Sequence, residues 1–94
     1  MRLSPKEQQE IKKILKEIFG DVKIYIFGSR LDDSKKGGDV DIFLQTFNPI
    51  KNKRAKRARA KPLLEEKLLK PIDIIIEEDA NSLIKEQAMQ GERL

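Results

Sequence analysis

The sequence predicts an α+β fold in which helices pack on a small mixed β-sheet. Three short runs rich in Val, Ile, Tyr and Phe are typical of strands: Val22–Phe27, Asp39–Gln45 and Pro71–Ile76. Segments with helical periodicity and helix start or stop signals lie before, between and after them. We therefore expect the order helix, strand, strand, helix, strand, helix. At 94 residues the chain has room for one modest core, so we expect a single domain over residues 1–94.

The first helix is indicated by its capping residues. Ser4 suits the N-cap, Pro5 suits the first helical position, and Glu7 completes a capping box. An apolar stripe at helical spacing follows and ends before Gly20, which we expect to be a left-handed cap; its members are Ile11, Ile14, Leu15, Ile18 and Phe19. The stripe could be a dimer seam, but packing on the sheet is the simpler interpretation, and the oligomeric state stays open.

The segment between the second and third strands is strongly basic. Residues 51–61 contain seven Lys or Arg side chains and no acidic residue, which indicates a solvated helix. We expect Pro62 to interrupt this helix and to begin another, with its inward leucines at Leu63, Leu64, Leu68 and Leu69. After the third strand, Asp79 is the candidate N-cap of a last helix over Ala80–Gln90. That helix would turn Leu83, Ile84 and Ala88 inward and stop at Gly91.

Composition narrows the possible chemistry. The chain has no cysteine, which excludes disulfides, thiolate metal sites and a cysteine nucleophile, and no histidine, which removes the commonest general base. Any catalysis must therefore use carboxylates, lysine, serine or a metal ion. We find no signal-peptide-like or membrane-spanning stretch and expect a cytoplasmic protein without membrane contact.

Three carboxylates stand out because they begin buried strands. Asp39 and Asp41 would share one face of a strand, roughly 6.5–7 Å apart, and Asp73 occupies a similar place in the third run. Like charges at a buried strand start repel each other unless a cation offsets them. Oxygen ligands suit Mg²⁺ or Mn²⁺. The simpler interpretation is a solvent-exposed strand end, and the mutual placement of all three acids favours the metal site.

The residues that follow the first strand could bind a nucleotide beside such a metal ion. Gly28-Ser29 ends the first strand and could offer backbone N–H groups to a phosphate, although Gly-Ser is also an ordinary turn. Arg30 could reach a triphosphate, although an exposed arginine after a turn is the simpler description. Together these residues predict a nucleotide-and-metal site.

The pattern resembles the minimal nucleotidyltransferases of the polymerase-β-like superfamily. Gly28-Ser29, nine residues, Asp39-Val40-Asp41 and a later lone Asp73 match that family's order, and the ending Ala88-x-x-Gly91-x-x-Leu94 is similar to its chain ends. The resemblance implies a nucleotidyltransferase fold, with Gly-Ser binding the nucleotide phosphates and the paired aspartates holding metal. It also implies that the third aspartate helps to bind metal and activates the attacking hydroxyl. Many members have Ser or Asp where this chain has Gly38, which implies a looser loop.

Three functions follow as hypotheses. In the first, a Mg²⁺-dependent enzyme moves a nucleoside monophosphate, AMP from ATP, to a hydroxyl acceptor. The resemblance implies that the acceptor lies on a HEPN-domain toxin and that the chain is its antitoxin. In the second, the chain neutralises such a partner by contact alone, without catalysis. In the third, Lys51–Lys61 binds nucleic-acid phosphates, or an acidic protein, although this tract lacks aromatic residues for base stacking.

Overall fold

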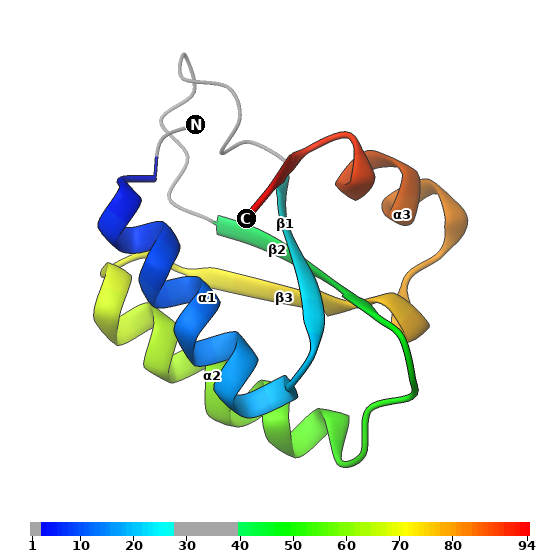
Figure 1. Cartoon of the computed structure of the whole chain (residues 1–94), viewed down its shortest axis with the longest axis horizontal. Coiled ribbons are helices and arrows are strands. Elements are labelled where there is room, and N and C mark those ends of the chain that lie inside the picture. The colour runs from blue at the N-terminus through cyan, green and yellow to red at the C-terminus, as the bar shows by residue number, and fades with distance from the viewer. Residues whose placement is uncertain (1–2, 28–39) are drawn as a thin grey trace.

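The computed structural model describes residues 3–27 and 40–94 and confirms the predicted α+β fold (Figure 1). The six predicted elements occur in the predicted order, joined by a 3-10 turn and a short final strand. They are α1 (Pro5–Phe19), β1 (Val22–Phe27), β2 (Val40–Thr46), α2 (Lys53–Leu68), β3 (Ile72–Ile76), η2 (Glu77–Asp79), α3 (Ser82–Met89) and β4 (Glu92–Arg93). Within the described part of the chain, no helix is long and apolar enough to cross a membrane.

The strands form one mixed sheet in the order β3-β2-β1-β4. β1 pairs antiparallel with β2 and with β4, whereas β2 and β3 are parallel. The short β4 was not predicted, because two residues cannot show the alternation that identifies a strand. It is held next to β1 by its own pairing and by the Leu94 N–H, which donates to the Ile24 carbonyl at 2.8 Å.

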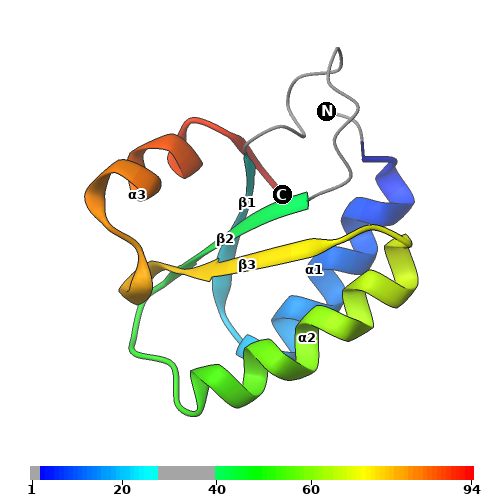
Figure 2. The same ribbon diagram turned by 180° about the vertical axis from the view of Figure 1, so that it is seen from behind.

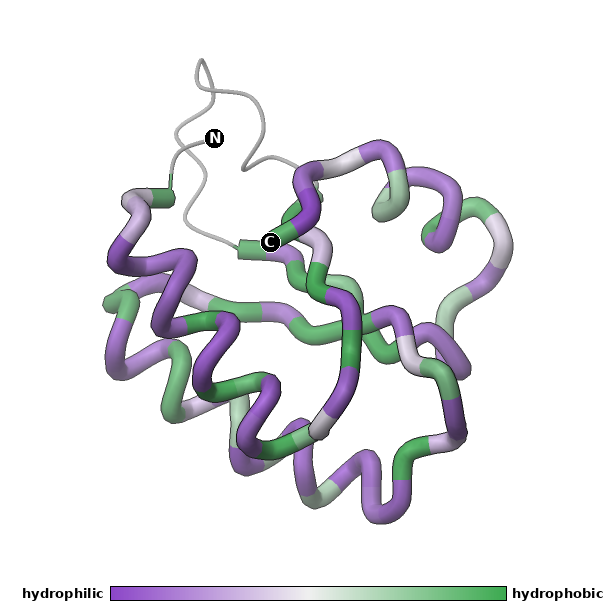
Figure 3. The backbone as a smooth tube through the Cα atoms, in the orientation of Figure 1, coloured by the Kyte–Doolittle hydropathy of each residue, from purple (hydrophilic) through white to green (hydrophobic). Residues whose placement is uncertain are grey.

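The two faces of the sheet bury different side chains, because successive residues of a strand point to opposite sides. α1 and α2 cover one face with a core of branched aliphatic residues, and the strands contribute Val22, Ile24, Ile26, Val40, Ile42, Leu44, Ile72, Ile74 and Ile76 to it. α3 packs on the other face against Tyr25, Phe27 and Phe43. Val22, Ile24 and Ile26 of β1 therefore face the first core, and Tyr25 and Phe27 face the second. Figure 3 shows the hydrophobic strands beside the largely hydrophilic α2.

The start of α1 has the predicted capping box. The Ser4 hydroxyl accepts the Glu7 N–H at 3.1 Å, and the Glu7 carboxylate accepts the Ser4 N–H at 2.9 Å. The other Glu7 oxygen pairs with Lys70 at 2.8 Å, which joins the start of α1 to the segment before β3. At the far end, Gly20 has the expected positive φ of 84°. Its ψ of −138° lies outside the left-handed helical region, so the predicted type of cap is wrong.

The predicted break at Pro62 is also wrong, because α2 runs through that residue without interruption. Pro62 lacks the N–H that would bond four residues back, a cost that packing must outweigh. Ala60, Leu64 and Leu68 recur every four residues across the proline and are all buried, so one continuous stripe holds both halves against the core. The leucines predicted beside them, Leu63 and Leu69, are exposed.

The last helix begins later than predicted. Asp79 lies in η2, and the N-cap is Asn81, whose side-chain oxygen accepts the Ile84 N–H at 2.8 Å. Ala88 is buried and Ile84, four residues earlier on the same helix face, packs beside it. Leu83 is 62% exposed, so its predicted inward position is wrong. Asn81 is an equally good N-cap residue, which is why the capping rule alone could not choose between the two positions.

Candidate active site

The structure brings two of the predicted carboxylates together. Asp41 and Asp73 are paired residues in the parallel register of β2 and β3. Adjacent strands lie about 4.8 Å apart, and paired residues point to the same face. Asp73 is exposed and Asp41 is half-buried. Two carboxylates therefore stand side by side where both strands begin.

The same row extends to the end of β1, because Asp41 pairs with Phe27 on its other side. Phe27 immediately precedes Gly28, Ser29 and Arg30 in the sequence. In both ribbon views the starts of β2 and β3 lie at the end of the sheet away from α3 (Figures 1 and 2). α3 therefore leaves the Asp41–Asp73 end of these strands uncovered.

The remaining predicted site residues lie outside the described part of the chain. These are Gly28, Ser29, Arg30 and Asp39. Residues 3–27 and 40–94 contain no group of three or more His, Cys, Asp or Glu side chains that could hold a metal ion. The Asp41–Asp73 pair nevertheless fits a divalent cation chemically, since adjacent carboxylates offer the oxygen ligands that Mg²⁺ prefers. The roles of all six residues stay predictions.

A basic hollow adjoins this pair and was missed in the sequence. Arg54, Arg57 and Lys61 of α2 line a depression of about 470 Å³ together with Asp73 and Ile74 of β3. We call it the α2 hollow. The signal was present, because positions 54, 57 and 61 have the i, i+3, i+7 spacing of one helix face. Only the fold shows that this face adjoins the strand that carries Asp73.

Part of the basic tract is neutralised by acids that lie distant in sequence. Lys53 contacts Asp79 at 2.6 Å and Glu78 at 3.7 Å, and Arg57 approaches Asp79 at 3.9 Å. The hydrogen bond from Lys53 lowers the pKa of the Asp79 carboxyl, and the same contact raises the pKa of Lys53. The acidic residues of η2 therefore balance the positive charge near the start of α2.

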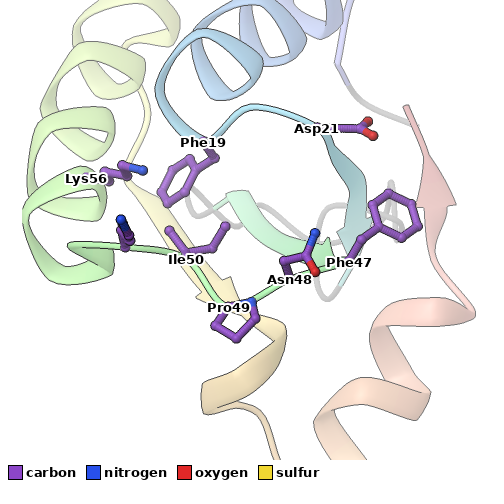
Figure 4. A pocket seen from close by; sticks show the side chains of 8 residues that line it. Phe19, Asp21, Phe47, Asn48, Pro49, Ile50 and Lys56 are labelled. Carbon is purple, nitrogen blue, oxygen red and sulfur yellow. The ribbon is translucent and has the colours of Figure 1, made fainter.

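A second hollow, of about 400 Å³, lies at the opposite end of the sheet (Figure 4). Its apolar lining is Phe19, Phe47, Pro49 and Ile50, and its charged residues are Asp21, Lys51 and Lys56. It adjoins the Val22–Thr46 pair, five residue pairs along the β1–β2 ladder from Phe27–Asp41. Asp21 is the one acid among its described lining residues, so this hollow offers no equivalent of the Asp41–Asp73 pair.

Comparison with known proteins places the chain among nucleotide-transferring domains. Residues 9–93 match the family model of the nucleotidyltransferase domain. No functionally curated protein matches the chain.

Solved toxin–antitoxin structures have the same fold. One, with AMP-PNP, is 22% identical with a TM-score of 0.76, over 92% of this chain and 70% of that one. Another, the toxin–antitoxin MntA–HepT, is 21% identical with a TM-score of 0.73, over 96% and 70%. A third is a tri-AMPylated HEPN toxin from Shewanella oneidensis in complex with MNT antitoxin. It is 22% identical with a TM-score of 0.72, over 93% and 67%. At these identities the likeness establishes a shared fold.

Proposed function

Because the chain belongs to the nucleotidyltransferase domain family, we propose that it transfers a nucleoside monophosphate from a nucleoside triphosphate to a hydroxyl acceptor. The observation that carries the proposal is the in-register pair of Asp41 and Asp73 on one face of the sheet. Asp39, two residues before Asp41, would supply the third carboxylate, and residues 1–94 would act as one domain.

Each residue has a distinct task in the proposed reaction. Asp39, Asp41 and Asp73 would hold Mg²⁺ or Mn²⁺, and the bound ion would offset charge on the phosphates. Gly28 and Ser29 would bind the triphosphate through backbone N–H groups, with Arg30 in reach of its charge. The acceptor oxygen attacks the α-phosphorus, the α–β phosphoanhydride bond breaks, and pyrophosphate leaves with the bonding electrons. Asp73 accepts the proton of the attacking hydroxyl, a role worth about 10²–10⁴-fold in rate.

We further propose ATP as the donor, AMP as the transferred group and a HEPN-type protein as the bearer of the acceptor, with the chain acting as its antitoxin in the cytoplasm. Two observations support this choice. One structure of the same fold contains AMP-PNP, and another pairs an MNT antitoxin with a tri-AMPylated HEPN toxin.

The first test is calorimetric titration of Mg²⁺ and ATP into wild-type protein and into Asp41→Asn and Asp73→Asn variants. We expect metal-dependent ATP binding that is lost or weakened at least tenfold in both variants. Asp21→Asn is the matched control, because Asp21 is an exposed carboxylate at the other end of the sheet. It should bind as wild type does.

Transfer itself is tested with ATP labelled at the α-phosphate and a purified HEPN protein. Label on that protein from α-labelled ATP, and none from γ-labelled ATP, would support adenylyl transfer. Tight association that neutralises the toxin without any transfer would instead favour an antitoxin that acts by contact alone. Retention of RNA by the isolated chain, without nucleotide binding, would favour the nucleic-acid hypothesis.

A further inference from the structure

The α2 hollow borders the proposed proton acceptor, and three of its six described lining residues are cationic. Asp73 belongs both to the row that contains Asp41 and to the wall of this hollow. β3 is an edge strand of the sheet, and no further strand covers its outer side within residues 3–27 and 40–94. A molecule seated in the α2 hollow would therefore contact the edge strand at Asp73, the residue that is proposed to receive the acceptor proton.

We propose that the α2 hollow binds an acidic protein segment and thereby presents a hydroxyl flanked by Asp or Glu side chains to Asp73. This inference rests on the proposed transferase function and specifies the acceptor of that same site.

The charges of the hollow favour an anion. Arg54 and Lys61 form no ion pair within the described part of the chain, and Arg57 reaches Asp79 only at 3.9 Å. Asp73 supplies a single negative charge against these three cations. Arginine also binds carboxylates with two parallel hydrogen bonds, which favours an acidic partner with defined geometry.

The size and surroundings of the hollow favour a protein over a nucleic acid. Positions 54 to 61 span about 10 Å of helix, enough for two or three carboxylates. Acidic residues lie at both ends: η2 contacts the start of α2 through Lys53, and Glu65 and Glu66 follow one turn beyond Lys61. Glu66, beyond the last of these cations, would repel a continuous phosphate backbone, whereas a short acidic segment can end before it. Among the described residues, no aromatic side chain lines the hollow for base stacking.

The first measurement is fluorescence anisotropy without nucleotide, on labelled peptides that carry a central tyrosine flanked by Glu, by Ala or by Lys. We expect the Glu-flanked peptide to bind wild-type protein about tenfold more tightly than the Ala-flanked one, with the difference shrinking at high salt. The double variant Arg54→Glu/Lys61→Glu should lose this preference. Arg59→Glu is the matched control, because Arg59 is exposed on the same helix and does not line the hollow.

The second measurement is transfer from α-labelled ATP with Mg²⁺ to the same peptides. The Glu-flanked peptide should be modified faster, and Arg54→Glu/Lys61→Glu should raise its KM about tenfold while ATP affinity stays unchanged. The milder pair Arg54→Gln/Lys61→Gln removes the charges without reversing them and should shift KM in the same direction. Circular dichroism of each variant confirms that it is folded.

The outcomes separate the two proposals. Equal binding of all peptides, an unaffected double variant, or displacement of the Glu-flanked peptide by single-stranded RNA would overturn the acidic docking while Mg²⁺-dependent ATP binding still supports the transferase. Selective binding of the acidic peptide by a protein that neither binds ATP nor modifies any acceptor would refute the transferase and support the docking surface alone.

Discussion

Replacing Gly91 with alanine should destabilise the end of β1, which directly precedes the predicted phosphate-binding residues. A Cβ at this position would lie 2.3 Å from the Ile26 carbonyl oxygen and 3.0 Å from the Phe27 Cβ. Side-chain Cβ atoms essentially never come within 3.0 Å of such a neighbour, so Gly91 and β1 would have to separate by about 0.7 Å. The φ of Gly91 is not in the positive range. Space, and not backbone conformation, requires the glycine.

The size of the effect follows from the kind of contact. The obstacle is strand backbone that also pairs with β2, so it cannot move aside as a flexible side chain would. Overpacking of this type costs about 1–3 kcal/mol. In a domain of this size each kcal/mol lowers the Tm by roughly 4–8 °C. We expect Gly91→Ala to lower both the free energy of unfolding in urea and the Tm by these amounts.

Two controls identify the cause. Gln90→Ala changes the exposed neighbouring residue and should alter stability by no more than about 0.5 kcal/mol. Gly20→Ala should also destabilise, but through its φ of 84°, since nothing lies within 4 Å of the added Cβ. Because Ile26 and Phe27 directly precede Gly28-Ser29, only Gly91→Ala should also weaken Mg²⁺–ATP binding. A Gly91→Ala protein as stable as wild type would refute the steric reasoning.

Three other substitutions test the fold and the site. Pro62→Ala should raise the free energy of unfolding by about 1–3 kcal/mol in urea titrations, because it restores a helical N–H inside α2; an unchanged or lower value would show that α2 is not a continuous helix there. Burial raises the pKa of Glu7, but the hydrogen bonds from Lys70 and from the Ser4 N–H outweigh it and leave the pKa below its ordinary 4.5. The folded state therefore gains stability from the Glu7 carboxylate above pH 4.5 and loses it as the pH falls through the lowered pKa; Glu7→Gln should flatten that acid limb of a stability–pH curve, and an identical limb in both proteins would contradict the assignment. Asp73→Glu, which keeps the charge but moves it by one methylene, should retain Mg²⁺–ATP binding better than Asp73→Asn does while slowing transfer at least tenfold in single-turnover assays; full activity would exclude Asp73 as the proton acceptor.

The elements near the site could be predicted because their signals are local. The capping box at Ser4 and Glu7 and the alternation of β1 each depend on residues within a few positions. β3 likewise begins within one residue of its predicted start. The family pattern could be recognised as well, because it is defined by residue types and their spacing along the chain: Gly28-Ser29, Asp39-Val40-Asp41 and Asp73.

The predictions failed where contacts with residues distant in sequence outweigh the local preference of a residue. Pro62 is a helix breaker by intrinsic propensity, yet α2 continues because Ala60, Leu64 and Leu68 are buried on one stripe. Asp79 and Asn81 are equivalent caps in sequence, and η2, whose Asp79 carboxylate pairs with Lys53, places the helix start at Asn81. In each case tertiary contacts contribute more free energy than the local helix or capping preference does.

The sequence by itself determined the α+β class, the order of its helices and long strands, and the residues that resemble a nucleotidyltransferase site. Only the tertiary structure decided that Asp41 stands opposite Asp73, because a parallel register joins strands separated by the whole of α2. It also decided that the basic face of α2 lines a hollow with Asp73. Such proximity comes from packing a helix beside an edge strand, and no spacing along the chain encodes it.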